Sequence, residues 1–93
     1  MAKKTVSFNK SGIERLPDNK SVLYRIQTSG GKTNYVGVAK KGRVQDRIRE
    51  HLEDGKIPGA KVQIEQMSSM DQATKKEGDI IARTEPKYNE QGK

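Results

Sequence analysis

The 93-residue sequence contains no cysteine, no tryptophan and only one histidine. Without cysteine it has neither disulfides nor a cysteine-based zinc site, and His51 alone cannot form a histidine-rich metal site. No apolar run approaches the ~18 residues of a membrane span, and no secretory signal pattern is present. We therefore expect a soluble, intracellular protein of the cytoplasm.

Large apolar side chains are also scarce. Valine, isoleucine, leucine and phenylalanine together fall below the roughly 20% at which composition begins to favour disorder. The apolar residues that are present nevertheless recur at strand and helix spacings, which favours a folded chain. We expect a single domain over residues 1–93, with the two ends, about 1–9 and 90–93, held loosely.

Positive charge is abundant. A formal net charge of +7 on so small a chain favours a polyanionic partner, with nucleic acid first. A basic surface that only keeps the protein soluble is the alternative, and charge alone does not decide between the two.

Strand patterns occur in three segments. Residues 21–27 and 33–39 are joined by the turn signal Ser29-Gly30-Gly31-Lys32, which predicts a β-hairpin. Residues 61–66 alternate polar and apolar side chains and predict a third strand.

Helix patterns separate and follow these strands. Residues 43–54 carry a buried stripe with four-residue spacing and end at Gly55. Residues 70–84 follow the capping residue Ser69, and Pro86 prevents their extension. A short helical turn is expected near residues 11–15. The order strand, strand, helix, strand, helix predicts a small α/β domain.

Glu77 is the most informative residue, because it falls near the centre of the apolar stripe of the last helix. Met70, Ala73 and Ile80 lie on the same stripe. An ionised carboxylate facing a core costs several kcal/mol unless a cation, a metal or water compensates it. We therefore interpret Glu77 as a functional-site candidate.

Two hairpin tyrosines and two helix residues accompany it. A tyrosine in a strand is usually packing, but Tyr35 lies beside Gly37, and glycine in a strand often marks the close approach of a ligand. Arg47 and His51, one turn apart, border the buried stripe of the middle helix. An arginine there usually extends its head into solvent, although a buried glutamate nearby would favour a more specific role.

Five segments in order resemble the GIY-YIG nuclease superfamily. Val22-Leu23-Tyr24 and Tyr35-Val36-Gly37 resemble its paired strand motif, and Arg47, Glu77 and Pro86-Lys87-Tyr88-Asn89 resemble its later motifs. The later segments are similar to the nuclease domain of the bacterial excision-repair incision subunit, and the earlier ones to phage homing endonucleases. The resemblance covers about residues 21–89. Val22 replaces the first glycine of the family, and Tyr35 and Arg47 are about two residues further apart than in the repair enzyme.

The resemblance implies a three-stranded, largely antiparallel sheet flanked by helices and a metal-dependent DNA endonuclease. Glu77 would bind one divalent cation, Mg²⁺ or Mn²⁺, and Arg47, with Arg43 as a competitor, would hold the scissile phosphate. Tyr24 and Tyr35 would position or deprotonate the attacking water, in an order that the sequence leaves open. His51 and Asn89 would support the site.

A basic segment follows the second predicted strand. Lys40, Lys41 and Arg43 are expected to contact DNA phosphates without reading bases. Three alternatives remain: a nucleic-acid-binding module without catalysis, a nuclease subunit that a protein partner brings to its substrate, and a structural ion pair between Glu77 and Arg47.

Overall fold

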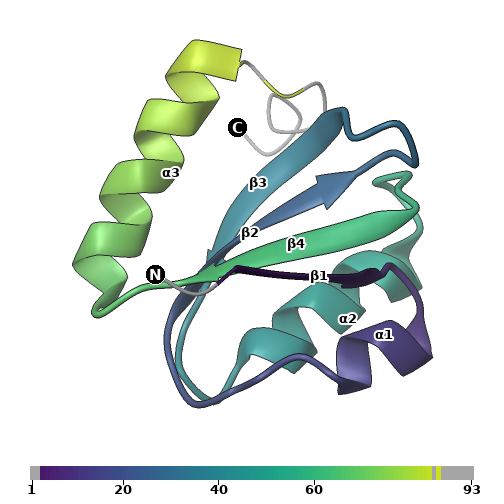
Figure 1. The fold of residues 1–93 in the computed structure, drawn as a ribbon, viewed down its shortest axis with the longest axis horizontal. Coiled ribbons are helices and arrows are strands. Elements are labelled where there is room, and N and C mark those ends of the chain that lie inside the picture. The colour runs from purple at the N-terminus through teal and green to yellow at the C-terminus, as the bar shows by residue number, and fades with distance from the viewer. Residues whose placement is uncertain (1–2, 85, 87–93) are drawn as a thin grey trace.

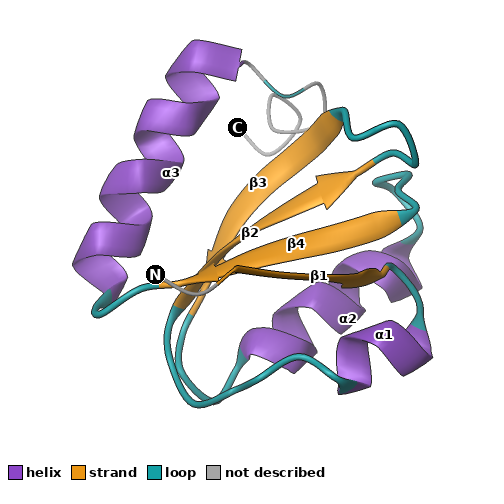
Figure 2. Cartoon of the chain, viewed as in Figure 1, coloured by secondary structure: helices purple, strands orange, loops and turns teal. Residues whose placement is uncertain are grey.

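The computed structural model describes residues 3–84 and residue 86 as a four-stranded antiparallel sheet between two layers of helices (Figures 1 and 2). The strands β1 (Lys3–Ser7), β4 (Lys61–Gln66), β2 (Val22–Gln27) and β3 (Thr33–Ala39) lie side by side in that order. Helices α1 (Lys10–Glu14) and α2 (Val44–Asp54) lie on one face, and α3 (Met70–Thr84) lies on the other. The α/β class is therefore confirmed.

The expectation of three strands is wrong, because residues 3–7 form a fourth strand. They pair antiparallel with β4 along their whole length, from Lys3 opposite Glu65 to Ser7 opposite Lys61. Val6 is the only apolar residue in this segment, so no alternating pattern marks it. The backbone groups along one edge of β4 supply the partners, and the buried Phe8 anchors the end of the strand. The expectation of a loosely held segment is wrong for residues 3–7.

Two apolar clusters fill the layers on either side of the sheet. The larger one lies between the sheet and helices α1 and α2 and includes Ile13, Tyr24 and Ile48. Phe8 also belongs to it, so residues that precede the predicted hairpin contribute to the core. The smaller one lies beneath α3 and includes Leu23, Val36 and Ile80. Alternate residues of β2 and β3 serve the two clusters, as the period of a strand requires.

Local signals fix the remaining boundaries. Gly55 ends α2 in the left-handed region at φ 68°, and its N–H donates to the His51 carbonyl, as a glycine in this position commonly does. The Ser69 hydroxyl accepts from the Gln72 N–H at 3.3 Å and caps α3. No helix in the described part of the chain is long and apolar enough to cross a membrane.

Candidate active site

Tyr24, Tyr35 and His51 form one aromatic cluster on the α2 side of the sheet. The Tyr24 hydroxyl and His51 Nε2 are 2.7 Å apart, a hydrogen bond. The ring centroids of Tyr35 and His51 are 4.7 Å apart, and those of the two tyrosines 6.1 Å. The register explains the grouping: Tyr24 of β2 lies opposite Gly37 of β3, so Tyr35 is its diagonal neighbour.

Gly37 makes room for a tyrosine rather than for a ligand. A Cβ atom at this position would lie 2.6 Å from the Cζ and hydroxyl atoms of Tyr24 and 3.0 Å from Cε2 of Tyr35. Such distances are far below van der Waals contact, so any larger residue would push the Tyr24 ring out of place. The group that approaches Gly37 closely is therefore the Tyr24 ring and not a ligand.

The environments of the two tyrosines differ. Tyr24 has no exposed surface, whereas Tyr35 is half-buried. Burial raises the pKa of both, the negative charge of Glu77 raises both further, and the positive charge of Arg47 opposes the shift. Both phenols therefore keep their protons at neutral pH. Only Tyr35 has a surface that solvent or substrate can reach.

His51 is neutral at physiological pH. Burial lowers the pKa of its imidazole, and the nearby Arg47 lowers it further. A neutral imidazole has one nitrogen that accepts a hydrogen bond. With Nε2 as that nitrogen, the Tyr24 hydroxyl donates to it. His51, which the sequence assigned only a supporting role, thus has the most direct contact with a predicted site tyrosine.

Arg47 stands at the rim of the cluster, with half of its side chain exposed. Its guanidinium lies 4.0 Å from Glu50 on the same helix, a weak surface pair. Its charge acts on both tyrosines and on His51. Arg43 pairs with Asp46 at 3.6 Å and has no such effect on the cluster, which favours Arg47 for the role beside the tyrosines.

Glu77 lies on α3, on the opposite side of the sheet from the aromatic cluster. It lies on the inward side of α3 between the buried residues Ala73 and Ile80 and is itself partly buried. Burial raises the pKa of its carboxyl group. Among the described residues no cation lies within ion-pair distance, so the structure does not contain the Glu77–Arg47 ion pair. Its charge is nevertheless felt by both tyrosines.

A shallow hollow with positive charge lies at the end of β3, between the beginnings of helices α2 and α3. Its volume is about 340 Å³, and Val38, Lys40, Arg43, Arg47 and Met70 line it. Every charged residue of this lining is positive. Lys41 and Lys20 are among the residues that line a second hollow of similar volume, about 330 Å³. The three predicted phosphate contacts are therefore divided between two neighbouring hollows.

Sequence reasoning missed one charged group. Glu65 of β4 is 3% exposed and lies on the α3 side of the sheet. Its Oε2 accepts from Lys76 Nζ at 2.6 Å, and its Oε1 lies 3.7 Å from Arg25 Nη1. Its neighbours on the same face of the strand, Lys61 and Gln63, are polar, so the alternating pattern gave no sign that Glu65 is buried. Asn89 lies outside the described residues.

The described residues contain no group of three histidine, aspartate or glutamate side chains that would hold a metal ion by themselves. Comparison with known proteins finds no matching family model, no similar curated protein and no similar solved structure. The nuclease resemblance consequently depends on the motifs and on the arrangement of their residues.

Proposed function

We propose that the protein is a metal-dependent DNA endonuclease with a GIY-YIG-type fold. The supporting observation is that motif residues far apart in sequence gather around strand β3. Tyr24, Tyr35 and His51 are in contact, while Arg47 and Glu77 act on both tyrosines through their charges. The hairpin, α2, β4 and α3 also follow one another in the order that the sequence patterns predict.

The chemistry of Glu77 fits a magnesium ion. Mg²⁺ is commonly bound through one or two carboxylates, with water and substrate phosphate oxygens completing its shell. Glu77 is a partly buried carboxylate whose raised pKa reflects burial without a compensating cation among the described residues. When bound there, the ion would supply charge stabilisation for the phosphate and the leaving oxygen.

The differing exposure of the tyrosines suggests a division of roles. Tyr35, which is partly exposed, would contact and orient the attacking water. Tyr24 has no exposed surface and would act as a positioning residue, fixed by its hydrogen bond to His51. His51, whose pKa burial and Arg47 lower, would accept the hydrogen bond of the Tyr24 hydroxyl and hold that tyrosine in place.

The substrate phosphate would occupy the hollow at the end of β3. Arg47 and Arg43 offer planar guanidinium groups there, and Lys40 adds a third positive charge. The outer surface of α2 instead carries four exposed carboxylates, those of Asp46, Glu50, Glu53 and Asp54. Asp46 and Glu50 pair with arginines three residues away, whereas the charged lining of the hollow is wholly positive, so DNA would approach from the β3 edge.

The decisive experiment is a nicking assay on supercoiled plasmid with Mg²⁺, with Mn²⁺ or with EDTA. We expect nicking with either metal, none with EDTA, and none from Arg47→Ala. Nicking that persists in EDTA would contradict metal dependence, and a folded protein inactive on plasmid, flapped, branched and single-stranded DNA would contradict the nuclease.

A binding module without catalysis is the second candidate, because the cationic hollows do not depend on Glu77. It predicts salt-sensitive DNA binding, weakened by changes at Lys40, Lys41 and Arg43, in the absence of any nicking. Affinity that is unchanged between low and moderate salt would exclude phosphate contacts in both candidates.

A further inference from the structure

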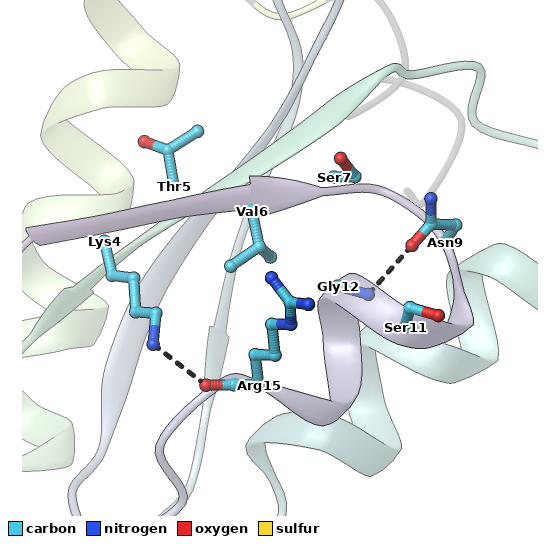
Figure 3. Close-up of a pocket in the computed structure, with 8 residues that line it drawn as sticks. All are labelled: Lys4, Thr5, Val6, Ser7, Asn9, Ser11, Gly12 and Arg15. Carbon is cyan, nitrogen blue, oxygen red and sulfur yellow. Dashed lines mark hydrogen bonds between the residues drawn. The ribbon is translucent and has the colours of Figure 1, made fainter.

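A groove with positive charge lies at the opposite edge of the sheet, between β1 and α1. Its volume is about 470 Å³, and the four consecutive strand residues 4–7 line it together with residues of α1 and both its flanks. In the sheet order, β1 and β3 are the two edge strands, so this groove is separate from the candidate active site. Figure 3 shows the strand above the groove and the short helix below it.

The charged side chains of this groove are Lys4 and Arg15. Lys4 Nζ donates to the Arg15 carbonyl oxygen at 3.1 Å, which joins the strand to the end of the helix. The Arg15 guanidinium extends toward Val6, between strand and helix (Figure 3). None of the lining residues is acidic, and no described carboxylate lies within ion-pair distance of either cation. The groove therefore favours a negatively charged occupant.

The strand supplies a second recognition element, its backbone. Among the described residues β1 pairs with β4 alone, so its outward backbone groups have no strand partner. The Ser7 carbonyl accepts from the Asn9 N–H at 2.9 Å, which leaves the outward groups before it for a ligand. An edge of this kind is a template for an added strand, in which main-chain hydrogen bonds give affinity and side chains give specificity.

The geometry of the groove is preformed. Gly12 lets α1 approach the backbone of Ser7 so closely that any Cβ atom would collide with the Ser7 carbonyl group. The Asn9 side chain accepts from the Gly12 N–H at 2.8 Å and fixes the first turn. A preformed groove needs little ordering when a ligand binds, which favours affinity.

We propose that β1 binds an extended acidic segment of a partner protein, which adds to the sheet as a further strand. A second copy of this chain is a poorer occupant, because the chain carries a net charge of +7 and its β1 would bring two further lysines to a groove that is already positive. The same lysines that prevent self-association would select an acidic partner. Such a site could recruit the protein to its place of action, and it does not depend on catalysis.

The test uses a fluorescein-labelled peptide, Ser-Val-Glu-Val-Glu-Thr, and the full chain. We expect saturable, salt-sensitive binding, with amide chemical-shift changes centred on residues 4–7 and Gly12. Lys4→Gln combined with Arg15→Gln should weaken binding by about three- to tenfold. Lys10→Gln, an exposed change on α1 outside the groove lining, is the matched control and should leave the affinity unchanged.

Two further peptides separate strand addition from simple charge attraction. A version with lysine in place of both glutamates should not bind, and a glutamate version N-methylated at alternate residues should lose most of its affinity. Equal binding of the N-methylated peptide would overturn strand addition. Failure of the acidic peptide to bind, or dimerisation of the protein through β1 in sedimentation, would overturn the acidic partner. Plasmid nicking by the Lys4/Arg15 variant serves as a separate readout and should be unchanged.

Discussion

Two carboxylates, those of Glu65 and Glu77, face the layer between α3 and the sheet. Their environments shift the pKa in opposite directions. Burial alone would raise the pKa of Glu65, but the hydrogen bond and charge of Lys76 outweigh it and hold the pKa below its usual value. Glu77, adjacent to Lys76 in sequence, has no such partner among the described residues, and burial raises its pKa. One carboxylate is stabilised in its charged form and the other is left uncompensated.

We expect this difference to distinguish a structural acid from a functional one. The pair with Lys76 helps to hold α3 on the sheet, although the buried Oε1 of Glu65 has no hydrogen-bond partner among the described residues. An uncompensated carboxylate costs stability, and such residues are characteristic of functional sites. The predictions below test whether Glu65 contributes to stability and Glu77 to catalysis.

The largest expected effect is on catalysis at Glu77. Glu77→Gln should reduce plasmid nicking at least about a thousandfold, because a neutral amide does not replace the charge of the proposed metal ligand. The thermal midpoint, followed by circular dichroism, should be unchanged or higher. Asp79→Asn, an exposed carboxylate on the same helix, is the control and should retain activity. Full nicking activity of the Glu77→Gln variant would contradict the functional role that we expect for Glu77.

The next effect is on stability at Glu65. Glu65→Gln should lower the free energy of unfolding by about 1–3 kcal/mol, because Lys76 and Arg25 lose their shared negative partner. Urea denaturation measures the change, and nicking at a temperature well below the unfolding transition should persist. A Glu65→Gln protein of unchanged stability would show that the ion pair contributes nothing.

A smaller loss of stability is expected at Lys76, the partner of Glu65. Lys76 is more than one-third exposed, so solvent screens its interaction and Lys76→Gln should cost only about 0.5–1 kcal/mol. Lys75→Gln, which alters an exposed neighbour on α3, should remain within about 0.5 kcal/mol of the parent protein. Equal costs for the two changes would place the stabilisation elsewhere.

The smallest effect is in the dependence of stability on pH. Glu77 has a raised pKa in the folded state, so its contribution is present below its unfolded pKa and is lost as pH rises through the folded value. Glu65 has a lowered pKa, so its contribution is present above the unfolded value and lost as pH falls.

Urea denaturation between about pH 3 and pH 6 measures both slopes. Relative to the parent protein, Glu77→Gln should gain stability as pH rises, whereas Glu65→Gln should lose it. Parallel curves for the two variants would contradict the opposite pKa shifts.

The strands and helices with a regular apolar period were accessible from sequence. The hairpin of β2 and β3, the stripe of α2 and the inward position of Glu77 on α3 all follow from local spacing. Strand β1 was not accessible, because it carries one apolar residue and forms by pairing with β4, some 60 positions later in the chain. Whether residues 3–7 form a strand therefore depends on the edge that β4 offers them and not on their own sequence pattern.

The candidate site divides in a similar way. Residue types and spacing identified Tyr24, Tyr35, Arg47 and Glu77 as candidates. The hydrogen bond between Tyr24 and His51 joins residues 27 positions apart, and no local pattern encodes such a contact. The Glu65–Lys76 pair likewise depends on how α3 crosses the sheet.

The sequence by itself determined which segments with a regular apolar period become strands and helices and which residues carry charge, because both depend on local period and composition. The tertiary structure decided which of these charges are compensated. Compensation depends on distance between groups that folding brings together: Lys76 reaches Glu65 and leaves its neighbour Glu77 without a partner among the described residues. As a result, Glu65 helps to hold α3 on the sheet, and Glu77 is available as the central residue of the proposed site.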